Sequence, residues 1–279
     1  MKIKTLTLRC RYWRPGTDYV TRIVERVRKH IREGDIVAVS EKAISTAMGN
    51  IVDESLITPG GLAWFLSSTW TRNIWGGFLG RAMGLKEKTI ENLRNYPRRE
   101  GAAHKQLALN QVGFFQSLRH YSEGGIDASN LPFTYVSLPL EHPERIASRI
   151  REAIFAETGE AVTVLIVDGD TTYSWRNLHI APRRLDYPGL IHFGGVMSFI
   201  IGRSLGFKAR QTPITVSGEA INPDRALWYA RLCHKLCGGG AGRTAWSMSD
   251  NMDTSLTGVT WEMLESVDHY PVTIIRVID

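Results

Sequence analysis

The chain has 279 residues, 43% of them hydrophobic and 22% charged, which is the composition of a globular protein with a substantial core. Its net charge of +6 arises from 34 basic and 28 acidic residues spread along the chain, so no basic tail or stripe indicates a nucleic-acid partner. Phosphorylated small molecules suit the same positive charge. Three cysteines are too few for a disulfide framework, and we therefore predict a cytoplasmic protein.

The N-terminal part predicts a strand, a helix and a second strand. Residues 1–13 alternate polar and apolar side chains like a strand and lack the continuous apolar region of a signal peptide. Apolar residues recur at helical spacing over residues 20–31, and a Gly-Asp turn ends this helix before the apolar strand 36–39. Lys42 and Ser45 follow that strand directly, at a position where ligand contacts are common.

The most apolar stretch, residues 62–85, contains Arg72 and Arg81. A membrane span needs roughly 20 predominantly apolar residues, so we expect no membrane association and interpret the stretch as a core helix or an oligomer contact. Its tryptophans, which suggest an apolar contact surface, are Trp64, Trp70 and Trp75.

A basic stretch, "NYPRREGAAHKQ", follows and includes His104 and Lys105. It could bind phosphates, but we interpret it as a solvated basic loop because runs of charged residues usually lie on the surface. Farther along the chain, residues 143–156 predict an amphipathic helix and residues 162–167 a buried strand. Together these two segments indicate an α/β unit.

Two acidic residues, Asp168 and Asp170, follow the predicted strand. A carboxylate at the end of a buried strand is costly unless it is solvated, paired or bound to a metal ion. Hard divalent cations take oxygen ligands, usually one or two carboxylates with waters and substrate phosphates, and Thr171 could add a hydroxyl. The alternative is an Asp-Gly-Asp turn whose side chains cap local backbone N–H groups.

A third acid, Asp127, lies in the glycine-rich turn "GGIDASN", from which it could converge with the other loops on one phosphate and metal centre. At this point the sequence resembles the coenzyme F-420 γ-glutamyl ligase family, over roughly residues 10 to 180 and more loosely beyond. The resemblance rests on four segments in the same order and at similar spacing: "PGTD" (15–18), "GDIVAVSEKAISTAMG" (34–49), "GIDASN" (125–130) and "VDGDTTYSWR" (167–176).

The resemblance implies a fold and an activity. The expected fold is a mixed α/β (α+β) domain over residues 1–279, with mixed sheets and a soft division into two interlocked subdomains. The expected activity is a GTP-dependent ligation of L-glutamate to the carboxylate of an anionic deazaflavin precursor through an acyl phosphate. The family also implies a homodimer.

The resemblance further implies the residues of the site. Mg²⁺ or Mn²⁺ would be held by Asp127 and by Asp168 or Asp170, a choice that the sequence leaves open. Residues matched to the nucleotide contacts are Lys42, Ser45, Gly49 and Thr171. Lys42 and Arg176 are our candidates for positioning the triphosphate during catalysis.

Departures from the family pattern keep two alternatives open. Met48 and Asn50 stand where the family usually has an acidic residue and an arginine, and "DGDTTYS" alters the usual acidic run. The first alternative is a related nucleotide-dependent amide ligase that acts on another carboxylate. The second is a non-catalytic protein of the same fold that binds a nucleotide or another anionic cofactor.

Two features near the C-terminus predict structure rather than chemistry. The segment "CGGGAGRT" (237–244) has one spacer too few for a P-loop, has Arg243 in place of lysine, and follows a predicted helix rather than a strand. In "CHKLC", Cys233 and Cys237 could form half of a zinc site, but without a second pair we interpret them as small buried hydrophobic residues.

Overall fold

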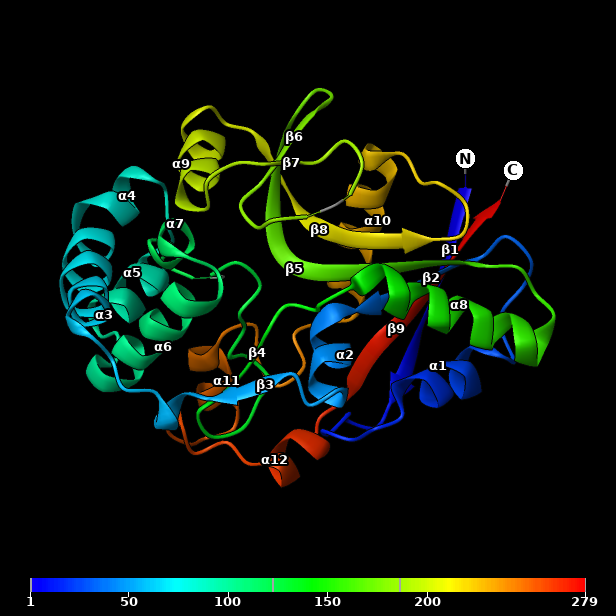
Figure 1. Cartoon of the computed structure of the whole chain (residues 1–279), viewed down its shortest axis with the longest axis horizontal. Helices are drawn as coiled ribbons and strands as arrows, with labels where there is room; N and C mark the ends of the chain where they lie inside the picture. Colours follow the sequence, from blue (N-terminus) through cyan, green and yellow to red (C-terminus); the bar gives the residue numbers. More distant parts are fainter. Residues whose placement is uncertain (1, 122, 186, 279) are drawn as a thin grey trace.

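A mixed sheet forms the centre of the molecule, in a computed structural model that describes residues 2–121, 123–185 and 187–278 (Figure 1). The strand order is β1-β9-β2-β5-β6-β7, and β8 also pairs with β5. β2 and β5 are parallel, whereas β9 is antiparallel to both β1 and β2. The predicted mixed α/β class is confirmed. The strands are β1 Lys2–Cys10, β2 Ile36–Ser40, β5 Thr163–Trp175, β6 Leu178–Ala181, β7 Ile191–His192, β8 Lys208–Ser217 and β9 His269–Ile278.

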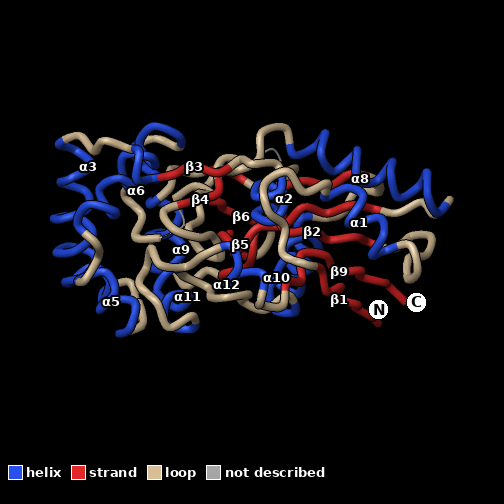
Figure 2. The backbone as a smooth tube through the Cα atoms, turned by 90° about the horizontal axis from the view of Figure 1, so that it is seen from below, coloured by secondary structure: helices blue, strands red, loops and turns tan. Residues whose placement is uncertain are grey.

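Helices cover both faces of this sheet (Figure 2). β2 is buried on both sides because Val37 and Val39 pack into one core while Ile36 and Ala38 pack into another. The first core is closed by α1, α2 and α8 and the second by α10. Strands covered on both faces read as continuous apolar runs, as this one does. The four helices are α1 Tyr19–Val27, α2 Glu41–Ala47, α8 Pro143–Thr158 and α10 Pro223–Leu236.

Helix α1 is shorter than predicted. It begins after Asp18, whose side chain caps the helix by accepting a hydrogen bond from the backbone N–H of Thr21, and it ends at Val27 rather than Ile31. Ile31 is still buried in the same core, because the chain turns back after the helix. Apolar periodicity cannot distinguish a last helical turn from a reverse turn that buries the same residue.

β5 is longer than the predicted strand and changes partner along its length. It pairs in parallel with β2 up to Val167 and antiparallel with β8 on both sides of Asp168, and its last residues pair with β6 (Figure 1). The register with β8 shifts between Asp168 and Thr171. The acidic pair therefore lies in a β-bulge inside a bent strand and not at a strand end, which corrects the prediction. Bulges are common next to active sites because they redirect side chains.

A helical lobe lies at the end of the molecule away from the two termini (Figure 1). Its π-helical segment η2 is interrupted at Gly77, and Trp75 is fully buried there with its indole N–H donating to the carbonyl of Leu118. Within the described residues, no helix has the length and apolar character needed to cross a membrane. The lobe helices are α3 Gly61–Phe65, η2 Leu66–Leu79, α4 Gly80–Ala82, α5 Glu87–Arg94 and α6 Arg98–Gln111.

The basic stretch interpreted as a solvated loop is helix α6; Arg98 and Arg99 are exposed as expected, but the interpretation is wrong for Lys105. Lys105 is fully buried, with its ammonium 2.6 Å from a carboxylate oxygen of Glu123 and 2.6 Å from the carbonyl oxygen of Arg119. Composition could not reveal these partners, because both lie in a later segment of the chain. The remaining elements are β3 Ile51–Asp53, β4 Tyr135–Ser137, η1 Glu54–Leu56, α7 Phe114–Ser117, α9 Val196–Ser204, α11 Ala245–Asn251 and α12 Trp261–Glu265.

Candidate active site

A cavity of about 720 Å³ brings charged and polar side chains from several segments together. It is lined by the start of α2, the turn 125–130, the bulge of β5, the end of α10, the loop that follows α10 and part of the helical lobe. Small-molecule sites commonly have volumes of roughly 300–1,000 Å³. The cavity therefore has room for a nucleotide or a substrate of similar size.

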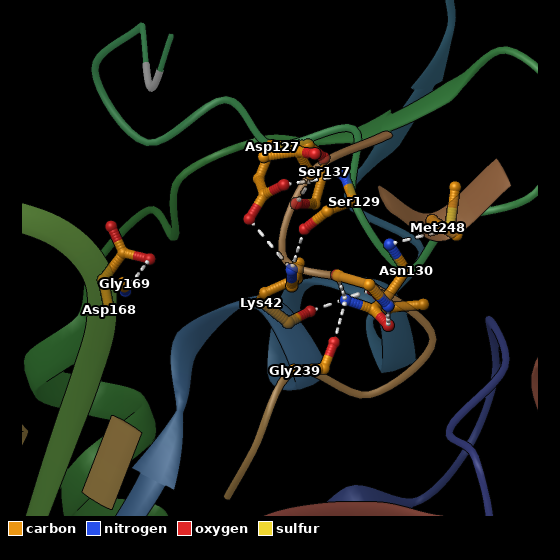
Figure 3. A network of polar contacts seen from close by, with 12 residues as sticks. Lys42, Asp127, Ser129, Asn130, Ser137, Asp168, Gly169, Gly239 and Met248 are labelled. Carbon is orange, nitrogen blue, oxygen red and sulfur yellow. Dashed lines mark hydrogen bonds and ion pairs between the residues drawn. The ribbon is translucent and has the colours of Figure 1, made fainter. Parts of the chain in front are cut away.

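Lys42 and Asp127 form an ion pair in this cavity (Figure 3). The Lys42 ammonium lies 2.9 Å from a carboxylate oxygen of Asp127 and 2.7 Å from the hydroxyl of Ser129. The Asp127 backbone is fixed by two hydrogen bonds with Ser137, and its second carboxylate oxygen accepts from the Ser129 N–H at 2.7 Å. Burial works to raise the pKa of Asp127, but the charge and hydrogen bond of Lys42 outweigh it and hold the pKa below its usual value.

Asp168 lies across the cavity wall in a more negative environment. One of its oxygens is 3.1 Å from the guanidinium of Arg183, which also binds Glu41 with two hydrogen bonds. Burial raises the pKa of Asp168, and the neighbouring carboxylates of Asp170 and Glu41 raise it further, against the opposing effect of Arg183. The other Asp168 oxygen accepts from the N–H of Gly169 at 2.7 Å, so the predicted turn-capping contact is also present (Figure 3).

The three predicted metal ligands, Asp127, Asp168 and Asp170, all line the cavity. Among the described residues, however, no three side chains of His, Cys, Asp or Glu stand close enough to form a metal site by themselves. Mg²⁺ is commonly held by only one or two carboxylates, with waters and substrate phosphates as the other ligands. Hard oxygen donors in a negative field fit an ion of that kind once a phosphate is bound.

Four predicted nucleotide or catalytic residues lie elsewhere. Ser45 is buried and its hydroxyl donates to the carbonyl of Leu138. Gly49 lies in the turn after α2, Thr171 pairs with β8 after the bulge, and Arg176 is at the exposed β5–β6 turn, over the neighbouring tryptophan ring. None of the four is among the described residues that line the cavity.

The sequence analysis missed His234. Its ring lies against the bulge, because a Cβ built on Gly169 would be 3.4 Å from His234 Cε1. Burial lowers the pKa of His234, and so do the nearby charges of Arg243 and Lys42, while Asp127 acts in the opposite direction. The segment "CHKLC" contains this histidine, but the sequence alone does not show that α10 places it beside the cavity.

The loop at residues 238–242, which we call the glycine-rich loop, also lines the cavity. It follows the helix α10, so its topology differs from a P-loop as predicted. Asn130 holds it in place: its amide N–H₂ donates to the carbonyls of Gly239 and Gly242, and its amide oxygen accepts from the N–H of Ala241 at 2.6 Å. Figure 3 shows Asn130 between this loop and the turn that carries Asp127 and Ser129.

A second charged cluster lines the cavity from the helical lobe. His104 lies between two carboxylates, 2.6 Å from Glu54 and 3.3 Å from Glu123, and Glu123 also binds Lys105. Burial works to lower the pKa of His104, but the carboxylates of Glu54 and Glu123 outweigh it and raise the pKa to about 10. The imidazole is therefore charged at neutral pH, so this cluster contains two carboxylates and two cations.

The chain is similar in sequence to a known protein family and to one other protein. A family model described as F420-0:Gamma-glutamyl ligase matches residues 7–182. The chain is also similar to a protein of Methanocaldococcus jannaschii, named Uncharacterized protein MJ1361, with 31% identity over 288 residues that cover 99% of this chain and 97% of that protein. The family match includes Lys42, Asp127, Asp168 and Asp170 but ends before α10 and the glycine-rich loop.

Proposed function

The chain belongs to the F420-0:Gamma-glutamyl ligase family, and from this we propose that it is a GTP- and divalent-metal-dependent ligase joining L-glutamate to the carboxylate of a deazaflavin precursor of coenzyme F-420. The observation that carries the proposal is the meeting of Lys42 with Asp127 and Asp168 in one cavity. These residues come from three separate segments that the family match covers.

The proposed reaction has two steps. An oxygen of the acceptor carboxylate attacks the γ-phosphorus of GTP, so the bond to the β-phosphate oxygen breaks and an acyl phosphate and GDP form. The amine nitrogen of L-glutamate then attacks the acyl carbon, the phosphate leaves with the bonding electrons, and the amine loses its proton as the amide forms. Phosphoryl transfer of this kind depends mainly on positioning and on stabilising charge on the phosphoryl oxygens.

The side chains on the cavity wall suit these tasks. Lys42 places a cation beside the phosphates, and its pairing with Asp127 and Ser129 fixes the ammonium in advance. Arg183 donates a hydrogen bond to the carboxylate of Asp168 and holds it in position. The guanidinium of Arg183 is itself fixed by its hydrogen bond to Glu41. A divalent ion held by Asp127 and by Asp168 or Asp170, when bound, would neutralise charge on the phosphate oxygens.

Two departures from the family pattern lie away from this chemistry. Met48 is exposed at the end of α2, and Asn50 uses its amide to bind the carbonyls of Leu138 and Pro139. Neither is among the described residues lining the cavity. These two replacements therefore do not change the cavity lining, whereas the altered run "DGDTTYS" contributes Asp168 and Asp170 to it.

The test measures phosphate release from GTP with Mn²⁺, L-glutamate and a panel of carboxylic acids that includes deazaflavin acceptors. We expect release that needs both glutamate and the deazaflavin acid, together with an amide product by mass spectrometry. Release with another acid only would assign a related amide ligase. GTP binding by calorimetry without turnover on any acid would instead indicate a binding protein.

We also propose a homodimer, supported by apolar side chains on the helical lobe. Trp75 and Trp70 point inward, each donating its indole N–H to the carbonyl of Leu118, so they contribute less surface than predicted. The exposed apolar residues of this segment are Leu62, Trp64, Phe65 and Phe78. Sedimentation equilibrium at micromolar concentration should show a dimer, and a Phe78→Glu variant should shift it toward monomer.

A further inference from the structure

The glycine-rich loop presents backbone rather than side chains to the cavity. Gly240 has a φ of +57°, and a Cβ there would lie 2.4 Å from the amide oxygen of Asn130. A Cβ on Gly242 would lie 2.3 Å from the backbone nitrogen of Met248. Both positions therefore require glycine, because Asn130 and Met248 occupy the space that a Cβ would need and the backbone of the loop packs closely against them.

The backbone of the loop has the alternation that suits anion binding. Gly238 and Gly240 have φ values of +71° and +57°, whereas Gly239 between them does not have a positive φ. Conformations of alternating hand turn successive N–H groups toward one side and form concave sites for anions. Asn130 supports the loop through three hydrogen bonds of 3.2 Å or less, so this shape is held before any ligand arrives.

Basic side chains surround the loop. Arg243 follows it directly and is exposed to the cavity, while His234 lies one helical turn before it, at the end of α10. Lys42, on α2, is near enough to His234 for its charge to lower the pKa of this histidine. The turn that carries Asp127 also carries Asn130, so one turn of the chain positions both the Lys42 ion pair and the glycine-rich loop.

We propose that the glycine-rich loop, His234 and Arg243 form a phosphate-binding subsite beside Lys42 that receives the phosphate chain of a nucleoside triphosphate. Arg243 supplies charge and His234 supplies a ring N–H donor. Gly239 and Gly240 supply backbone N–H donors, since the N–H groups of Ala241 and Gly242 already donate to Asn130 and Gly239. The subsite lies outside residues 7–182, so the part of the chain beyond the family match completes the site. The identification of the anion as a nucleotide rests on the proposed function, whereas binding of a polyphosphate does not.

The test uses inorganic tripolyphosphate as the probe, measured by titration calorimetry on the full chain in Mg²⁺ buffer. Arg243→Gln and His234→Gln are the test variants. Lys235→Gln is the matched control, because Lys235 is an exposed residue of α10 that is not among the described residues lining the cavity. Arg243 is also exposed, so its replacement should leave the fold intact, and circular dichroism and thermal melting verify this for each variant.

We expect wild-type protein and Lys235→Gln to bind tripolyphosphate with equal affinity. Arg243→Gln should weaken binding about tenfold or more, since a hydrogen bond to a charged group contributes about 1.5–3 kcal/mol, and His234→Gln should weaken it by less. The affinity for GTP should fall in parallel, while the affinity for guanosine should not change.

Three results would overturn the subsite. The first is that wild-type protein binds no tripolyphosphate, and the second is that the test variants bind it as tightly as wild type does. The third is that Lys235→Gln loses as much affinity as the test variants, which would show only a long-range attraction between charges. Its failure is distinct from failure of the proposed function. Ligation of glutamate that survives both substitutions with unchanged GTP affinity refutes the subsite alone. Variant-sensitive tripolyphosphate binding without any ligation supports the subsite and refutes the ligase.

Discussion

The helical lobe and the sheet each contribute a charged cluster to the cavity, and they differ in how their charges are balanced. In the lobe, Lys105 and charged His104 face Glu54 and Glu123. Around Asp168, burial and then the neighbouring carboxylates of Asp170 and Glu41 raise the pKa of this acid, against the opposing charge of Arg183. A buried cluster in which positive and negative charges are equal in number stabilises one folded arrangement of the chain. A cluster with excess negative charge is stabilised when a cation or another ligand binds.

Buried charge near a cavity does not by itself mark the reacting centre. The lobe cluster is as deeply buried as the Asp168 side, with Lys105 fully covered and Glu123 2% exposed. Its hydrogen bonds join η1, α6 and the segment before the acidic turn. We therefore assign it a structural role, and the Asp168 side a functional one. Four predictions test that division.

The largest effect should come from Lys105→Met. Removing one partner of a buried ion pair leaves a buried charge uncompensated and costs about 3–5 kcal/mol of unfolding free energy. Urea denaturation measures this loss, with Arg98→Met, an exposed position on the same helix, as the matched control. The folded fraction of Lys105→Met should retain GTP affinity. A stable variant that no longer binds GTP would move this cluster into the functional site.

The second effect concerns Asp168→Asn, which keeps the shape of the side chain but removes its charge. We expect turnover to fall about a hundredfold or more, equivalent to about 2.7 kcal/mol of transition-state stabilisation, and Mn²⁺-dependent GTP binding to weaken. Asp170→Asn and Asp127→Asn, made in parallel, identify which acids take part. If Asp168 only caps its turn, asparagine will replace it without loss of activity in a steady-state assay.

The third effect is a dependence of stability on pH. The folded pKa of His104, about 10, lies above its unfolded value of about 6.5, so its stabilisation is complete below about pH 6.5 and is lost as pH rises toward 10. Between these limits the free energy of unfolding should fall by up to about 1.4 kcal/mol per pH unit. Denaturation at pH 7, 8 and 9 measures the slope, which His104→Gln should reduce. Equal slopes in both proteins would show that His104 is not charged.

The smallest effect should be that of Lys42→Ala on binding. Lys42 is partly exposed and contributes little to the core, so the variant should fold normally and bind GTP about tenfold more weakly, a difference of about 1.4 kcal/mol. Calorimetry with GTP and guanosine separates a phosphate contact from a base contact. Unchanged GTP affinity in folded protein would remove Lys42 from the phosphate site.

The sequence by itself determined the local elements and the family. The apolar run of β2, the spacing of apolar residues in α8 and the order of four segments each depend on near neighbours, and the structure or the family match confirms them. Lys42, Asp127, Asp168 and Asp170 could be named for the same reason. Each lies next to a strand, helix or turn that the neighbouring residues in the sequence predict.

Only the tertiary structure decided which side chains meet. The bulge at Asp168 lies where β5 leaves its parallel partner β2 while its pairing with β8 continues, and the identity of these partners is a long-range property. Likewise, His234 reaches the cavity because α10 packs on the sheet, and Asn130 holds a loop more than 100 residues farther along the chain. Ser45 and Arg176 share the family segments but point elsewhere. Sequence spacing carries no information about such contacts, because burial and pairing with distant strands determine the direction in which a side chain points.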